Sequence, residues 1–461
     1  MQLSLMAVRQ LQFVDVIVEM GESEGFRKME LERRDQTRSS CNENMEQYLV
    51  NSTLHGLRYV GDRKISYFER TFFGLSFVFV ILLSGYFITN VWNKWSATPM
   101  IIALNSKSTS VTDIPFPAVT ICNMNNAKAS KVSSFVKGSF NEFLLEGLCN
   151  KRDNLSSNDF SSNWPQFREF IIDVSQSCKE MFLLCKFASK VEYCMRLFDT
   201  ALTDEGLCCT FNQVHRKYLV ANYNVNDEWD VEVDEDNNLQ PTDWTPETGY
   251  VEKIDNFRRF YPRPGPGSGI HMGLTVVLNV NVDEYHCSST DSKGFKVLLH
   301  SPTETPQIQN FGFSITPGYE SRVVITPRIS DANFKIRSIP QSQRNCIFAS
   351  EGNLAYFRTY SRKNCELECQ SNLILEACGC VLYYMPRTSN ETSICNRDDY
   401  DCYSNTMRAI EFKRNETFTC HCLPACFELS FSGEISNAHL GTEPFHTKNN
   451  FIKAFGKGFV E

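Results

Sequence analysis

The chain has 461 residues, 42% of them hydrophobic, and a formal net charge of −8. It is too long for a disulfide miniprotein and long enough for two or more domains with hydrophobic cores. The acidic balance and the lack of a run rich in Lys and Arg argue against a nucleic-acid-binding protein.

The first marked element is a run without charged residues from Thr71 to Asn93. A bilayer core of about 30 Å is spanned by about 20 apolar residues in a helix, so residues 71–93 are predicted to form a transmembrane helix. Basic residues are more frequent before the run than after it. The positive-inside rule therefore places residues 1–70 in the cytoplasm and residues 94–461 outside the cell, with the plasma membrane as the predicted location.

The cysteines and the glycosylation motifs agree with this orientation. Only Cys41 precedes the apolar run, and the other eighteen cysteines follow it. An even number of thiols on one side of a membrane fits a disulfide-rich ectodomain in an oxidising space. Asn154, Asn390 and Asn415 begin N-x-S/T motifs after the run and are predicted to be glycosylated. The few histidines lack zinc-finger spacing, so no metal site is predicted.

The first part of the ectodomain is predicted to hold one strand, a region rich in helix formers and an acidic loop. The second half of residues 111–126 is predicted to be a strand. Within residues 127–205, three stretches carry apolar residues at helical spacing, namely FNEFLLEGL, WPQFREFIIDV and CKEMFLLCKFASKVEYCMRLF. Residues 227–236 hold seven carboxylates. A solvated loop is favoured there over a cation- or proton-sensing site or a charged edge strand.

The following segments have the alternation of apolar and polar residues that is typical of sheet strands. They are GLTVVLNVNVDEY, KGFKVLLHS and SRVVITPRI, and FELSFSGEIS after Cys426 repeats the pattern. Residues 261–269, which precede them, are predicted to be a loop because they are rich in proline and glycine. The ectodomain is therefore predicted to contain a β-sheet core.

Ten cysteines lie between Cys346 and Cys426, with the spacing C-x18-C-x3-C-x8-C-x-C-x14-C-x6-C-x17-C-x-C-x3-C. Thiols at this density indicate a module stapled by disulfides. Two stretches inside it, CELECQSNLILEACGC and NTMRAIEFKR, are predicted to be helical. Spacing alone does not choose among the possible pairings.

Four segments, in this order, resemble those of one family. They are STLHGLRYV (Ser52–Val60), FPAVTICN (Phe116–Asn123), GLCCTFN (Gly206–Asn212) and the cysteine block with its CELEC, CGC, YMP and CHCLPAC motifs. Together they resemble the degenerin/epithelial sodium channels, and within them the pickpocket-type branch. The likeness covers roughly residues 41–436. Cys209 stands where the family motif usually has a tyrosine.

The resemblance implies a membrane-anchored α+β protein with one N-terminal transmembrane helix and a large disulfide-rich ectodomain. Its parts would be a β-sheet palm core, a helical finger (127–205), a helical, disulfide-stapled thumb (346–426) and a final palm strand and tail (427–461). The implied function is a subunit of a trimeric, amiloride-sensitive, sodium-selective channel gated through its ectodomain. Its partners would be copies of itself or other family members, the lipid membrane and sodium ions; no nucleic acid and no cofactor is expected.

The resemblance also implies roles for single residues. His55 and Gly56 would act in gating, and Phe116, Pro117, Cys122 and Asn123 form the motif that follows the membrane. Tyr383, Tyr384 and Pro386 are left open between coupling and plain packing. The implied Cys122–Cys208 bond would tie the strand after the membrane to the palm. Five further implied bonds would join two antiparallel helices of the thumb along their length: Cys346–Cys426, Cys365–Cys422, Cys369–Cys420, Cys378–Cys402 and Cys380–Cys395. Six cysteines have no implied partner: Cys149, Cys178, Cys185, Cys194, Cys209 and Cys287.

No second apolar run follows residue 436, whereas the family carries its selectivity filter on such a helix. These 461 residues alone are therefore expected to conduct no current. The alternatives are a pore-less regulatory or dominant-negative subunit and a single-pass type II receptor or adhesion ectodomain. An enzyme is not predicted, because no nucleophile-elbow, zinc-protease or nucleotide-loop motif occurs.

Overall fold

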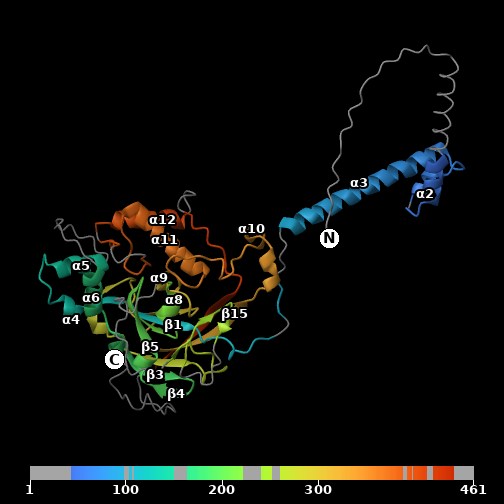
Figure 1. The fold of residues 1–461 in the computed structure, drawn as a ribbon. Coiled ribbons are helices and arrows are strands. Elements are labelled where there is room, and N and C mark those ends of the chain that lie inside the picture. The colour runs from blue at the N-terminus through green and yellow to red at the C-terminus, as the bar shows by residue number, and fades with distance from the viewer. Residues whose placement is uncertain are drawn as a thin grey trace, which may run out of the picture. The chain divides into compact units, whose positions relative to one another are not determined.

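The computed structural model describes residues 43–54, 56–97, 103–105, 108–149, 164–221, 240–251, 260–387, 392–396, 398–412 and 419–440. The chain forms two compact units that divide between Pro99 and Met100 (Figure 1). His55, the three predicted glycosylation sites (Asn154, Asn390 and Asn415) and the acidic run 227–236 lie outside the described residues.

The first unit is helical. A helix over residues 43–51 is followed by α2 (Leu57–Gly61) and by α3 (Tyr67–Ala97). Within the described part of the chain, α3 is the one helix long and apolar enough to cross a membrane, with a mean hydropathy of 2.1 over its most apolar window. None of its residues is buried. The helix contains the predicted run 71–93 and extends beyond it at both ends.

The second unit is built on a five-stranded antiparallel sheet with the strand order β14-β13-β1-β6-β5. Every residue of β1 (Ala118–Asn123) and β6 (Gly206–Phe211) is buried, as expected for central strands covered on both faces. The remaining strands are β5 (Phe198–Thr203), β13 (Phe295–His300) and β14 (Phe313–Ile315). The predicted strands near residues 118–126 and 293–301 are confirmed.

Smaller sheets surround this core. β15 (Tyr319–Ser330) and β16 (Glu428–His439) pair along all twelve residues of each strand, which confirms both predicted strands. The other sheets are β11 (Leu274–Leu278) with β3 (Phe182–Phe187) and β4 (Lys190–Glu192), β12 (Tyr285–Ser288) with β2 (Asn125–Lys128), β7 (Gln240–Pro241) with β10 (Phe260–Tyr261), and β8 (Trp244–Thr245) with β9 (Gly249–Tyr250).

One predicted helix is wrong. The stretch from Cys178 is α-helical only in α7 (Cys178–Met181), continues as the β3–β4 hairpin and ends in a short 3-10 helix (Cys194–Arg196). Phe187 pairs with Lys190 across Ala188 and Ser189, which both have positive φ (48° and 66°). A two-residue turn with two positive φ values matches the twist of a hairpin, and β3 gains a second neighbour in β11. Tertiary pairing therefore overrides the helical spacing of the apolar residues.

The other predicted helices are confirmed. FNEFLLEGL forms α5 (Phe140–Leu148) and WPQFREFIIDV forms α6 (Trp164–Val174). In the cysteine block, α11 (Arg362–Cys378) begins at the Ser361 N-cap, whose hydroxyl accepts the Asn364 N–H, and ends at Gly379 with a φ of 72°. α12 spans Tyr400–Glu411. Shorter helices are α4 (Ala129–Val132), α8 (Arg216–Leu219), α9 (Ile308–Phe311) and α10 (Gln341–Arg344).

Candidate functional site

The motif after the membrane helix enters the core of the second unit. The Phe116 ring meets Phe187 and Phe211 edge to face, with centroids 5.3 and 5.7 Å away. Its backbone carbonyl accepts a hydrogen bond from Asn212 Nδ2 at 2.6 Å. Pro117 is buried directly before β1, where a residue without an N–H removes no bond from the ladder. The first half of the motif therefore anchors the chain where it joins the β-core.

Asn123 ends β1 and connects three other segments. Its Nδ2 donates to Gln176 Oε1 at 2.5 Å and to the Val280 carbonyl at 3.0 Å. Its Oδ1 accepts from the Asn125 N–H at 2.9 Å and from the Tyr285 hydroxyl at 2.8 Å. The amide thus uses both of its ends, and Asn123 holds the end of the central strand against the residues after α6 and around β12.

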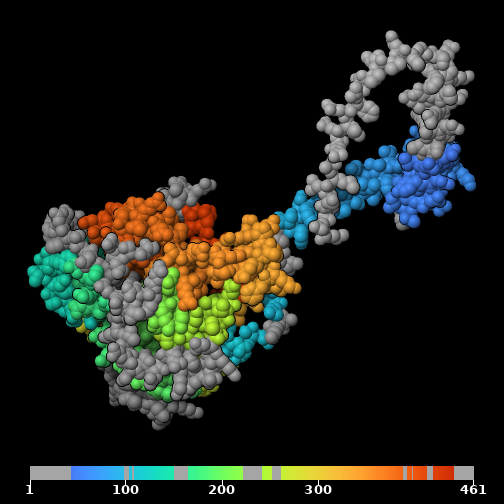
Figure 2. All heavy atoms as spheres, viewed as in Figure 1, coloured from blue at the N-terminus to red at the C-terminus, as the bar shows by residue number. Residues whose placement is uncertain are grey.

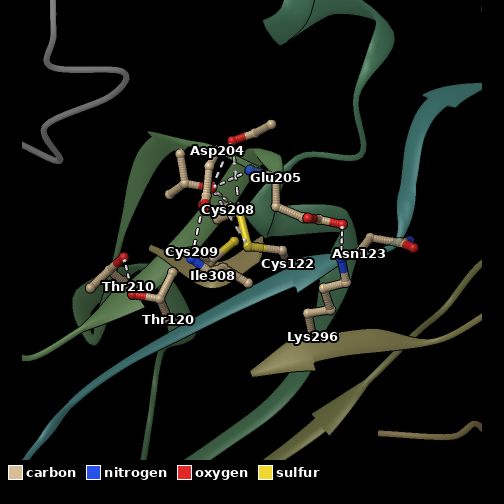
Figure 3. The surroundings of a disulfide bond; sticks show 12 residues. Thr120, Cys122, Asn123, Asp204, Glu205, Cys208, Cys209, Thr210, Lys296 and Ile308 are labelled. Atoms are coloured by element: carbon tan, nitrogen blue, oxygen red, sulfur yellow. Dashed lines mark hydrogen bonds and ion pairs between the residues drawn. A yellow bond between two sulfur atoms is a disulfide. The ribbon is translucent and has the colours of Figure 1, made fainter. Parts of the chain in front are cut away.

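Two adjacent cysteines of β6 tie it to different neighbours. Cys208 bonds to Cys122, its register partner on β1, and Cys209 bonds to Cys178 of α7 (Figure 3). Successive side chains of a strand point to opposite faces, so the two bonds leave β6 in opposite directions. Cys209, which replaces the family's usual tyrosine, thus has a partner of its own.

The remaining disulfides complete the set. Cys149 pairs with Cys287 and Cys185 with Cys194, two pairs that the sequence left open together with Cys178–Cys209. The five bonds of the cysteine block are those that the resemblance implies: Cys346–Cys426, Cys365–Cys422, Cys369–Cys420, Cys378–Cys402 and Cys380–Cys395.

The expectation that these five bonds join two helices along their length is wrong. Only Cys378–Cys402 links α11 to α12. Cys365 and Cys369 of α11 instead bind the non-helical segment around Cys420 and Cys422. The nested order arises because the chain returns past α11 after α12 has ended.

An acidic turn of the half-buried Asp204 and the buried Glu205 lies beside the Cys122–Cys208 bond, between β5 and β6 (Figure 3). The Asp204 carboxylate accepts the backbone N–H groups of Ile308 at 2.9 Å and Gln309 at 2.8 Å. Glu205 Oε1 lies 2.7 Å from Lys296 Nζ, and its side chain is fully buried. The turn closes through Gly206, whose φ of 94° favours glycine.

The Ser289 hydroxyl completes the Glu205 pair. It donates to Glu205 and accepts from Lys296 Nζ at 3.0 Å. The carboxylate, the ammonium and the hydroxyl therefore form a closed triangle between the β5–β6 turn, β13 and the residues after β12.

The acidic turn lies where three parts of the second unit meet. Tyr383 of the cysteine block packs edge to face on Phe167 of α6, with centroids 5.6 Å apart. Leu207 of β6 belongs to the same buried cluster as Val381 and Phe167. We call this region the junction. It is formed by residues 203–207, by the residues of α6 that face them and by residues 381–384. Figure 2 shows the α11–α12 part (orange) near the α5–α6 part (teal) on one face of the second unit.

Burial sets the protonation of the groups at the junction. Burial raises the pKa of Asp204 to about 6, and the Glu205 charge adds to the rise while the backbone hydrogen bonds to Ile308 and Gln309 oppose it. Burial also raises the pKa of the Tyr383 and Tyr384 phenols, which stay uncharged. Asp204 is therefore a carboxylate that can take up a proton under mildly acidic conditions.

His300 is buried on the other side of β1 and titrates in the opposite sense. Its Nε2 lies 2.9 Å from Thr120 Oγ1, and Thr120 contacts Thr210 at 2.9 Å. Burial lowers the pKa of His300 to about 3, so the ring is neutral. The folded chain thus binds this proton less tightly than the unfolded chain, and His300 costs stability as the pH falls below 6.5.

Asp204 gives a testable pH dependence. Its folded pKa of about 6 exceeds the ordinary value of 3.8, so its contribution to stability rises as the pH falls through 6 and is complete below 3.8. The Asp204→Asn variant keeps an acceptor oxygen for α9 and loses this titration. Between about pH 7 and about pH 5 we expect wild type to gain on the order of 1–2 kcal/mol relative to the variant.

The measurement is thermal unfolding of the purified chain and of Asp204→Asn at both pH values. His300 and the other carboxylates act equally in both proteins, so the difference isolates Asp204. Identical pH dependence of the two unfolding temperatures would contradict the assignment.

The His-Gly segment lies in the first unit. Gly56 is the N-cap of α2 and has a φ of 90° and a ψ of −28°, a left-handed conformation that other residues adopt with strain. The turn before α2 therefore depends on glycine.

Asp204, Glu205 and Lys296 were not singled out from the sequence. Asp204 and Glu205 directly precede Gly206, the first residue of GLCCTFN, and this Asp-Glu-Gly sequence could have predicted an acidic turn there. Lys296 sits in a stretch that alternates as an ordinary strand, and nothing local marks it as buried.

Comparison with known proteins gives consistent results. Residues 48–455 match the family described as amiloride-sensitive sodium channel. The chain is 44% identical to Pickpocket protein 28 of Drosophila melanogaster over 409 residues, covering 88% of this chain and 67% of that protein. It is 22% identical to Sodium channel protein Nach of the same species over 416 residues (85% and 72%). It is 25% identical to Acid-sensing ion channel 1C of Danio rerio over 432 residues (88% and 71%).

The match includes the whole apolar helix α3, the β-core with its acidic turn and the whole cysteine block. Within the matched residues, the described structure has one long apolar helix near the N-terminus and nine disulfides in the second unit. The chain therefore belongs to the amiloride-sensitive sodium channel family, the degenerin/epithelial sodium channels.

Proposed function

We propose that this sodium channel subunit assembles, as a homotrimer or with other members of its family, into a sodium-selective, amiloride-sensitive channel of the plasma membrane. The family match over residues 48–455 carries the proposal. The family is one of ion channels and not of enzymes, and the described structure adds the ectodomain through which such a channel would be gated.

The proposed topology places residues 1–70 in the cytoplasm and the second unit outside the cell. The disulfides support it, because the second unit holds nine of them and a reducing cytosol would not preserve such bonds. The exposed apolar side chains of α3 support it as well, since a lipid bilayer would cover them.

We propose that the junction transmits movements of the cysteine block to the β-core. Tyr383 and Val381 contact α6 and β6 there, and the Glu205–Lys296 pair fixes the β5–β6 turn to β13. A displacement of the block would therefore reach the central sheet directly. At the cytoplasmic side, the left-handed Gly56 supports a gating role for the His-Gly segment.

The function is tested by recording currents from cells that express this chain together with a relative such as Pickpocket protein 28 of Drosophila melanogaster. We expect a sodium current that amiloride blocks and that differs from the current of the relative alone. Cells that express only these 461 residues test the expectation that they conduct nothing by themselves.

Three results would contradict parts of the proposal. A current carried equally by potassium would contradict the proposed sodium selectivity. A current that amiloride does not block would contradict the proposed amiloride sensitivity. If this chain only suppressed the current of the relative and added none of its own, the proposed channel subunit would be replaced by a regulatory subunit.

A further inference from the structure

Two helices of the first unit approach each other at a residue without a side chain. Gly61 is the last residue of α2 and the one buried residue of that helix. A Cβ atom on Gly61 would lie 2.6 Å from Leu49 Cβ and 3.2 Å from both Val50 Cγ2 and Val50 N. Carbon atoms in contact lie about 3.5–4.0 Å apart. The 43–51 helix therefore occupies the space that any other residue at position 61 would need.

The same helices are fixed to the start of α3. Arg63 pairs with Glu46 of the 43–51 helix at 2.5 Å. Arg70 Nε donates to the Val60 carbonyl at 2.9 Å, and the Tyr59 and Phe73 rings stack with centroids 4.7 Å apart. We call the 43–51 helix, α2 and residues 67–73 of α3 the N-terminal helix cluster. Its parts hold one another through packing, an ion pair and a hydrogen bond.

The His-Gly segment takes its position from this cluster. α2 has only five residues, between its N-cap Gly56 and its last residue Gly61. An α-helix of five residues is less than two turns long, so it moves as a rigid piece. A displacement at Gly61 is therefore passed to Gly56.

We propose that Gly61 is a positioning residue for channel gating: its missing side chain lets the 43–51 helix dock against α2, and this docking holds the His-Gly segment in place. The inference rests on the proposed gating role of that segment. It concerns a residue outside the His-Gly motif, and it depends on shape and not on charge.

The test compares glycine-to-alanine substitutions within the first unit. Gly61→Ala places the new Cβ against Leu49, whereas Gly74→Ala places it 3.8 Å from Val60 Cγ2, an ordinary contact, and Gly85→Ala meets nothing within 4 Å. Alanine is the better helix former, so propensity alone predicts no loss in any of the three. We expect Gly61→Ala to lower the sodium current per channel at the cell surface by about tenfold, and both controls to leave it unchanged.

A second substitution separates positioning from a general folding defect. The nearest atom to the added methyl group is Leu49 Cβ, so Leu49→Gly combined with Gly61→Ala is expected to restore most of the current. Leu49→Ala keeps the Cβ and is expected to restore none. Docking itself is read from the yield of a disulfide between Glu46→Cys and Arg63→Cys, formed by adding a thiol oxidant to isolated membranes because the cytosol is reducing. This yield is expected to fall in the Gly61→Ala background.

Gly56→Ala keeps the two proposals apart, because the left-handed backbone at Gly56 disfavours alanine. A lowered current in Gly56→Ala with a normal current in Gly61→Ala overturns the positioning role alone. Normal currents in both variants overturn the gating role of the His-Gly segment as well. A loss in Gly61→Ala that Leu49→Gly does not rescue also overturns the positioning role.

Discussion

Replacing Lys296 by methionine is expected to destabilise the second unit by about 3–5 kcal/mol, because it leaves a buried carboxylate without its cation. The Glu205 side chain is fully buried and that of Lys296 is 9% exposed. Glu205 Oε2 already has no hydrogen-bond partner among the described residues. In Lys296→Met, Oε1 would keep only the Ser289 hydroxyl. Denaturant unfolding of the purified chain measures the loss, and delivery to the cell surface should fall with it.

A double substitution tests the cause. Glu205→Gln together with Lys296→Met removes both charges, and we expect it to recover most of the lost stability. Arg322→Met is the matched control, since it breaks an exposed pair with Glu320 at 2.9 Å, and it should cost no more than about 1 kcal/mol. If Lys296→Met were as mild as Arg322→Met, the buried pair would not have the role given to it here.

Removal of the Cys122–Cys208 bond is expected to have an effect of similar size. The bond joins residues 86 positions apart, and closing a loop of that length restricts the unfolded chain by about 4–5 kcal/mol. Both cysteines have no exposed surface. We therefore expect the double variant Cys122→Ala/Cys208→Ala to unfold at much lower denaturant concentration under non-reducing conditions, with a small cavity adding to the loss.

The control is a bond of the same unit that closes a short loop. Cys185 and Cys194 are nine positions apart, so their joint replacement by alanine should cost only about 2–3 kcal/mol. Equal losses for the two double variants would show that loop length does not govern the contribution of these bonds.

The strands and most helices could be predicted from the sequence because their signals are local. β1 and β6 are short apolar runs that end at turns, and α5 and α6 carry apolar residues at helical spacing. The β3–β4 hairpin had the same spacing as a helix, and only its pairing with β11 decides the outcome. Local spacing cannot report a partner strand that comes much later in the chain.

The candidate site was only partly predictable for the same reason. The resemblance supplied the post-membrane motif and the Cys122–Cys208 bond, because each of the two cysteines lies in a contiguous motif, FPAVTICN or GLCCTFN. The Glu205–Lys296 pair depends on β6 and β13 flanking β1 on its two sides. The role of Gly61 depends on a neighbouring helix. Neither the pair nor the close approach leaves a pattern in the sequence.

The adjacent bonds of Cys208 and Cys209 have a consequence for biosynthesis. If Cys122 formed its disulfide with Cys209 in place of Cys208, β6 would slip by one residue against β1. A slip of one residue turns every side chain of a strand to the opposite face. The buried Thr210 and Phe211 would then exchange sides. Oxidation must therefore follow the alignment of the two strands, or be corrected by an isomerase, before the second unit can reach its native fold.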